Sequence, residues 1–146
     1  MIEVFFGVLK SGCRVEDRRF EDLERLLPCL AVDLIVAWRV LFLCRLGRGC
    51  PEMSCEAVFE PAEWQSVYVV VRRESPPKRA SKLQEMIRLV AQLVGYLNRK
   101  RDDEPGPQTL WLGLQRLHDI ATCWKVFGPG ARQEEATAAG TAAELV

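Results

Sequence analysis

The sequence predicts a mainly α-helical fold, a bundle of about five helices. Apolar residues recur at helical spacing along most of the chain, and clusters of proline and glycine separate these stretches. Of the 146 residues, 49% are hydrophobic, which is enough to bury the core of one ordinary domain. The chain carries no internal repeat, no glycine-rich phosphate loop and no histidine cluster. We therefore expect one helical domain without a recognisable nucleotide-binding motif.

Charge and cysteine content restrict the possible partners. The 20 basic and 20 acidic side chains cancel, so the chain has no overall basic field and any contact with DNA must be local. The six cysteines follow no secretory leader, so we expect reduced thiols in the cytoplasm. Cys50 and Cys55 have a spacing that zinc ligands sometimes use, but no second pair completes a site. His118 is the only histidine, and we assign it no chemistry.

The first predicted helix covers residues 2–10 and ends at Gly12. At about 100° per residue, four apolar side chains share one side and pack inward. These residues are Ile2, Phe5, Phe6 and Leu9. Glu3 and Lys10 lie on another side and face outward.

A charged helix over residues 13–28 follows, and Pro28 should kink it or divide it from a helix over 29–46. The 29–46 stretch is the most apolar part of the chain. It is slightly short of the roughly 20 residues that a membrane span needs, and it contains Asp33 and Arg39. We therefore expect a buried helix, a break at the glycines that follow, and no membrane partner.

Residues 47–62 read as a loop, and Pro61 can open a short helix. The valine-rich stretch 67–71 also fits a strand, but we predict helix. After a turn-rich linker, Ser81 offers an N-cap with Gln84 three residues later, and helical spacing continues to about residue 100.

Thr109 can cap a last helix over residues 110–126. Its inward face is formed by Leu110, Leu114, Leu117, Ala121 and Trp124. These elements divide the chain into residues 1–46, residues 47–127 and a small, polar tail over 128–146 that we expect to be disordered.

Residues 2–12 resemble part of a signature of bacterial cut-and-paste DDE transposases of the insertion-sequence-four and Tn-five type. The signature reads Tyr-x2-Arg-x3-Glu-x6-Lys, commonly with an Ile-Glu dipeptide, an aromatic residue and then Leu-Lys-x-Gly. The matching residues are Ile2, Glu3, Phe5 and Leu9 to Gly12, with six residues between Glu3 and Lys10. Later segments resemble, in the same order, the helical dimerisation region of that family, so the resemblance covers most of residues 2–127. It implies that the RNase H-like sheet and the two catalytic aspartates lie upstream of this chain.

The resemblance also implies roles for individual residues. DNA cleavage by two Mg²⁺ ions needs several carboxylate ligands, and Glu3 would be the third catalytic carboxylate and a metal ligand. Lys10 would hold a phosphate near the cleaved end of the transposon DNA. Arg14, Arg18 and Arg19 would extend this contact. A single carboxylate cannot hold two Mg²⁺ ions, so we expect the chain alone to be inactive.

The 110–126 helix carries more apolar surface than one side of a lone helix usually needs. Because C-terminal helices join two subunits in the family, the resemblance implies a homodimer, or a mixed dimer with full-length transposase. Leu110, Trp111 and Leu114 would form the interface. Packing of all three into the chain's own core is the alternative. Two functions follow: a C-terminal transposase fragment, or a stand-alone helical interaction protein such as a trans-dominant inhibitor of transposition.

Overall fold

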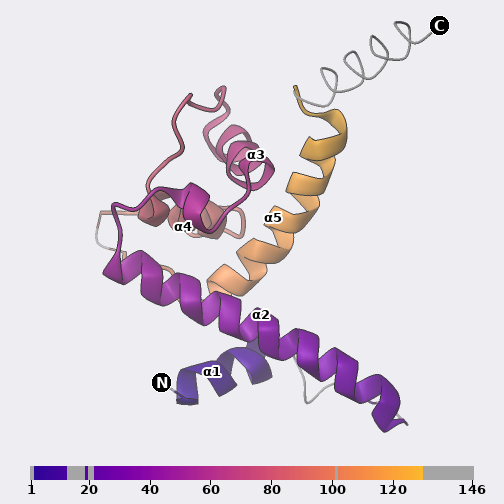
Figure 1. The fold of residues 1–146 in the computed structure, drawn as a ribbon. Coiled ribbons are helices and arrows are strands. Elements are labelled where there is room, and N and C mark those ends of the chain that lie inside the picture. Colours follow the sequence, from indigo (N-terminus) through magenta and orange to yellow (C-terminus); the bar gives the residue numbers. More distant parts are fainter. Residues whose placement is uncertain (1, 13–18, 20–21, 101, 130–146) are drawn as a thin grey trace, which may run out of the picture.

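The computed structural model describes residues 2–12, 19, 22–100 and 102–129. This part of the chain contains helices and no β-strand, which confirms the mainly α fold. The α-helices are α1 (Ile2–Gly7), α2 (Leu23–Gly49), α3 (Pro61–Arg72), α4 (Leu83–Gln92) and α5 (Pro107–Phe127) (Figure 1). A π-helical turn, η1 (Val8–Gly12), continues α1, and a short 3₁₀ turn, η3 (Cys55–Ala57), precedes α3.

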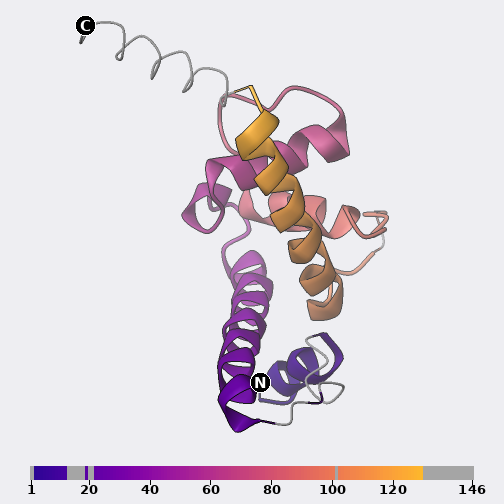
Figure 2. The same ribbon diagram turned by 90° about the vertical axis from the view of Figure 1, so that its right-hand side faces the viewer.

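The helices α3, α4 and α5 gather at the C-terminal end of α2, and the first half of α2 extends away from them with α1 alongside (Figure 2). The core lies where α2 meets this group. Its fully buried side chains include Val40, Leu43, Val67, Leu83, Met86, Leu89, Val90, Leu110 and Leu117. Every one of these four helices therefore contributes one apolar side to a single core.

The predicted inward face of the first helix is only partly correct. Ile2 is 71% exposed and Phe6 is 49% exposed, whereas Val8 and Leu9 are buried. The physical reason is the change to a π-helix at Val8, which reduces the rotation per residue and turns two consecutive side chains toward the core. The N-terminal half of the face consequently remains on the surface.

The predicted division at Pro28 is wrong, because α2 continues through this residue. Pro28 lies in the second turn and removes one backbone hydrogen bond, while the N–H groups of Arg25 and Leu26 bond to the carbonyl oxygen of Asp22 at 3.3 and 3.2 Å. The predicted break at Gly47 and Gly49 is correct only at the second glycine. Buried Gly47 packs against α4, and the helix ends only at Gly49.

The prediction that the 29–46 helix is buried is also wrong. The helix α2 is 27 residues long, and most of its apolar surface outside the core remains exposed, with Ile35 at 66% and Trp38 at 58%. By length and composition it is the one described helix that could cross a membrane, and 22% of its most apolar window is buried. Trp38 stacks on Phe42 on this exposed side, with 5.2 Å between the ring centroids.

Proline defines where α3 begins. Pro61 occupies the first turn, and the backbone N–H of Glu60 donates a hydrogen bond to the carboxylate of Glu63 at 2.9 Å. The valine-rich stretch 67–71 lies inside this helix, so the prediction of helix over strand is confirmed. Val67 is fully buried, whereas Val70 is 48% exposed.

The helix α4 is shorter than predicted at both ends. The backbone carbonyl of Ser81 accepts a hydrogen bond from the N–H of Cys55 in η3, at 3.0 Å. Ser81 is therefore engaged in this backbone pairing, and Lys82 is the N-cap of α4. Gly95 adopts a left-handed backbone with φ of 93°, and the N–H of Tyr96 bonds back to the carbonyl of Ala91 at 3.2 Å. This glycine turn ends the helix well before residue 100.

The last helix begins earlier than predicted, because Pro107 takes the first turn and Gly106 is the N-cap. Its predicted inward face is confirmed for Leu110, Leu117 and Ala121, which are buried, whereas Leu114 and Trp124 are half-buried. Gly113 allows α4 to approach closely, since a Cβ atom at this position would lie 2.6 Å from the carbonyl oxygen of Val90. The predicted disordered tail lies, from residue 130 on, outside the described residues.

Candidate subunit interface

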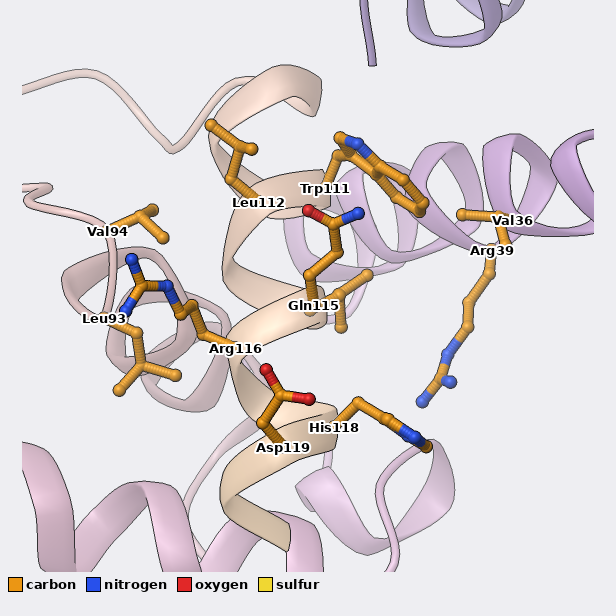
Figure 3. A pocket seen from close by; sticks show the side chains of 11 residues that line it. Val36, Arg39, Leu93, Val94, Trp111, Leu112, Gln115, Arg116, His118 and Asp119 are labelled. Atoms are coloured by element: carbon orange, nitrogen blue, oxygen red, sulfur yellow. The ribbon is translucent and has the colours of Figure 1, made fainter. Parts of the chain in front are cut away.

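The outer face of α5 forms the floor of an open hollow with a volume of about 1020 Å³. Val36 and Arg39 of α2 form one wall, and Leu93 and Val94, which follow α4, form the other. In Figure 3, Trp111 and His118 extend from α5 toward the α2 side, while Arg116 extends toward Leu93 and Val94. The hollow is therefore a groove along α5 with apolar and charged side chains.

A second, apolar hollow of about 450 Å³ continues along α5 toward its C-terminal end. It is lined by Val70 of α3 and by Ile120, Cys123, Trp124 and Phe127 of α5, with Asp119 shared between the two hollows. Phe127 is 81% exposed and Val126 is 59% exposed. Large exposed apolar side chains beside an apolar hollow indicate a surface that another protein covers.

Five exposed residues share one side of α5, which is turned away from Leu114. Leu112, Arg116, Asp119, Cys123 and Val126 alternate steps of four and three residues, and all of them are exposed. We call these five residues the α5 seam. Sequence reasoning missed the seam because charges on one side of a helix usually mark a solvated face.

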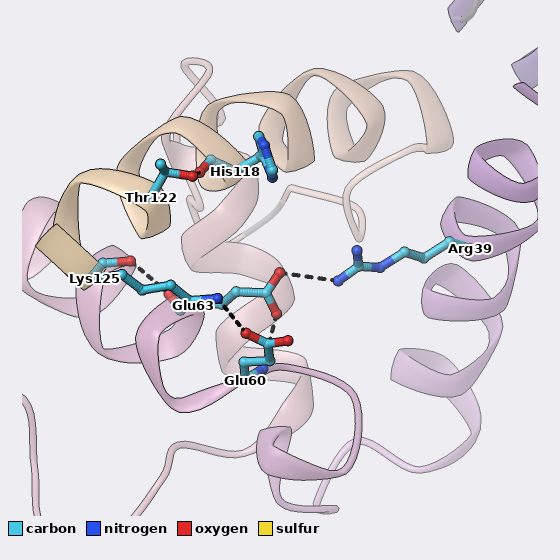
Figure 4. A network of polar contacts seen from close by, with 7 residues as sticks. Arg39, Glu60, Glu63, His118, Thr122 and Lys125 are labelled. Carbon is cyan, nitrogen blue, oxygen red and sulfur yellow. Dashed lines mark hydrogen bonds and ion pairs between the residues drawn. The ribbon is translucent and has the colours of Figure 1, made fainter. Parts of the chain in front are cut away.

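A network of ion pairs holds the three helices around this face (Figure 4). Arg39 of α2 pairs with Glu63 of α3 at 3.3 Å, and Lys125 of α5 pairs with Glu60 at the start of α3 at 2.8 Å. The hydrogen bond from Lys125 lowers the pKa of the Glu60 carboxyl, and the same contact raises the pKa of Lys125. The Lys125–Glu60 pair is largely exposed and the Arg39–Glu63 pair is partly exposed, so both orient the helices more than they stabilise the fold.

The three residues of the predicted interface differ in exposure. Leu110 is 1% exposed and packs inside the core, while Trp111 and Leu114 are half-buried, contact the core and line the groove. Leu110 thus supports α5 from within, and Trp111 and Leu114 are the members that a second protein can reach. Their role in an interface stays a prediction.

The residues that the transposase resemblance singled out lie at the N-terminal end of the described chain. Glu3 on α1, Lys10 on η1 and Arg19 are exposed, whereas Arg14 and Arg18 lie outside the described residues. Within the described ranges, no three His, Cys, Asp or Glu side chains lie close enough together to hold a metal ion. Glu3 therefore does not form a Mg²⁺ site with other described residues, and its catalytic role stays a prediction.

Cys44, Cys50, Cys55 and Cys123 are free thiols. Burial raises the pKa of the Cys55 thiol to about 11, so this thiol remains protonated and unreactive at neutral pH. Cys50 is exposed and lies outside the core. Cys123 is also exposed and belongs to the α5 seam.

The described helices leave two hollows and large apolar side chains uncovered along α5, which is typical of protein-association domains. The family model described as "Transposase Tn5 dimerisation domain" matches residues 35–138, which is more than half of the chain. The chain therefore belongs to this family, and dimerisation is its family function. The segment with Glu3 and Lys10 lies outside the matched residues. No curated protein and no solved structure matches the chain.

Proposed function

We propose that this chain is the dimerisation part of a DDE transposase and forms a homodimer through the outer face of α5. The observation that carries this proposal is the groove of about 1020 Å³ along α5, which continues into the apolar hollow beside Phe127 within the family-matched region. Trp111 and Leu114 form part of the groove, and aromatic and leucine side chains in such positions anchor protein interfaces.

Truncation of these anchors is expected to weaken the dimer. Trp111→Ala and Leu114→Ala should each raise the dissociation constant by roughly tenfold, because each removes apolar area at a desolvated contact. Sedimentation of the wild type and both variants over a range of concentrations measures this change. Leu97→Ala is the matched control, since Leu97 is 64% exposed and lines neither hollow on α5. A wild type that remains monomeric at every concentration contradicts the homodimer.

We further propose that residues 1–146 do not cut DNA without other protein segments. A two-metal mechanism needs several carboxylates around the ions, and by resemblance this chain supplies only Glu3. Incubation of transposon-end DNA with the purified chain and Mg²⁺ should give no nicking or strand transfer above background, and Glu3→Ala should behave like the wild type. Robust cleavage that Glu3→Ala abolishes would overturn this proposal.

The same α5 face supports a mixed dimer with full-length transposase in the cytoplasm. In such a dimer the chain would act as a trans-dominant inhibitor, which is the alternative function. By resemblance, Lys10 and Arg19 would contact transposon-end DNA in either case, with Arg14 and Arg18. Of these four residues, the structure describes Lys10 and Arg19. Both are exposed, as a contact with phosphates requires.

A further inference from the structure

We propose that the exposed apolar side of α2 is a second self-association surface, on which the α2 helices of two copies of this chain pack antiparallel. The surface is formed by Leu27, Ala31, Leu34, Ile35, Trp38 and Phe42, and we call it the α2 stripe. None of these residues lines either hollow on α5. The inference therefore goes beyond the proposed α5 homodimer and does not depend on it.

The α2 stripe lies opposite the core. The buried residues of α2, among them Asp33, Ala37 and Val40, share one side of the helix, and the six stripe residues share the other and are all exposed. In Figure 2, α1 lies on one side of the first half of α2, and no described helix runs along the opposite side. An apolar helix side of this length that no described element covers indicates contact with another molecule.

The stripe carries a charge of opposite sign at each end. Glu24 lies one turn before its first residue and Arg45 lies one turn after its last, and both are exposed on the stripe side of α2. Within the described part of the chain, neither residue takes part in an ion pair. Both charges are therefore available to a second molecule.

These charges decide the direction in which two stripes pack. In a parallel pair with two-fold symmetry, Glu24 would face Glu24 and Arg45 would face Arg45, so like charges would meet at both ends. In an antiparallel pair, Glu24 of each copy lies beside Arg45 of the other, and opposite charges meet at both ends. The stripe thus favours the antiparallel arrangement.

The same register matches the apolar side chains by size. Trp38 of one copy lies opposite Ala31 of the other, so the largest side chain of the stripe meets the smallest. Leu34 and Ile35 lie opposite each other at the centre of the pair. The two groups of helices that pack on the core side of α2 then lie on the outer sides of the pair and do not collide.

The area of the stripe fits a weak dimer. Ile35 is 66% exposed and Leu27 is 60% exposed, and a large side chain offers roughly 150–250 Å², so the stripe exposes on the order of 500 Å² per chain. A pair would cover about 1,000 Å², which is the lower end for a specific interface. A second copy is the occupant because it supplies an opposite charge to both ends of the stripe at once.

A charge-swap experiment tests this pairing. In a pair of Glu24→Arg chains, guanidinium groups face each other at both ends, and in a pair of Arg45→Glu chains, carboxylates do. In a mixed pair, one chain carries two guanidinium groups and the other two carboxylates, so both ends are attractive. Labelled Arg45→Glu should therefore bind unlabelled Glu24→Arg at least tenfold more tightly than unlabelled Arg45→Glu, measured by sedimentation. The α5 face is the same in every chain and contributes equally to both affinities.

Two controls accompany the charge swap. Arg79→Glu reverses an exposed charge outside α2, and this variant should show no preference for Glu24→Arg. Because Glu24 lies in the first turn of α2, its reversal also acts against the helix dipole, so circular dichroism must show native helicity. A defect in the helix alone would not be rescued by the second variant.

Ile35→Lys tests the apolar centre of the stripe. With both surfaces intact, a chain has two different self-association faces, so the wild type should form species larger than a dimer as its concentration rises. Ile35→Lys places a charge at the centre of each stripe and should stop assembly at the dimer, while the exposed position leaves the fold intact.

The outcomes separate this pairing from the α5 homodimer. If the swapped chains show no preference for each other and Ile35→Lys assembles like the wild type, the α2 pairing is wrong, while the α5 homodimer keeps its own test in Trp111→Ala. If the wild type floats with phosphatidylcholine vesicles and Ile35→Lys does not, the stripe binds lipid and the pairing is also overturned.

Discussion

Gly113→Val is expected to lower the melting temperature by roughly 10 °C or more, through overpacking where α4 crosses α5. A Cβ atom at Gly113 would lie 2.6 Å from the carbonyl oxygen of Val90 and 3.1 Å from its carbonyl carbon. These are backbone atoms of a buried helix, so the side chain cannot be accommodated by a rotamer change and α4 must move as a whole. Overpacking typically costs about 1–3 kcal/mol or more, a large share of a net stability of about 5–15 kcal/mol.

The matched control for this substitution is Gly49→Val at the C-terminal end of α2. A Cβ atom there would meet no other atom within 4 Å, so the same added side chain points into open space. Thermal unfolding followed by circular dichroism at one fixed protein concentration compares the two variants with the wild type, which keeps any contribution of dimerisation constant. Equal melting temperatures for the two valine variants would mean that the α4–α5 crossing is not close.

Leu117→Ala is expected to destabilise the fold by about 2–5 kcal/mol, since it leaves a cavity at the centre of the core. Leu117 is 1% exposed and lies on the side of α5 that faces the other helices. Leu97→Ala is the control, because Leu97 is 64% exposed and the same truncation removes few contacts. Urea titration should shift the unfolding midpoint strongly for the first variant and only slightly for the second. Similar midpoints would contradict the assigned core.

The apolar periodicity in the sequence identified the helices, but not all of their ends. The inward face of α5 was predicted from spacing alone, because a buried stripe with a period of 3.6 residues is a local property. The start of α4 depends instead on a backbone pairing between Ser81 and Cys55, which are far apart in the sequence. The continuation of α2 through Pro28 required weighing one lost hydrogen bond against the packing of the whole helix. Both features depend on residues far apart in the sequence, so a local pattern does not predict them.

The candidate interface was predictable in part. Trp111 and Leu114 were identified from their apolar character, and the structure places both in the groove. Spacing placed Leu110 on the inward face as well as in the predicted interface, and the structure shows that it lies in the core. Arg116 and Asp119 were missed because an isolated charge pair on a helix resembles a solvated surface. The structure shows that Arg116 lines the first hollow and that Asp119 lines both.

The exposed aromatic side of α2 has a practical consequence for the colloidal behaviour of the isolated chain. Trp38 and Phe42 stack on a helix surface that also exposes Ile35 and Val32. At neutral pH the formal net charge is zero, so no long-range repulsion keeps these surfaces apart. A protein that exposes apolar side chains and carries no net charge precipitates readily as its concentration rises. Mild detergent or a pH away from neutrality is therefore the appropriate condition for handling this protein in solution.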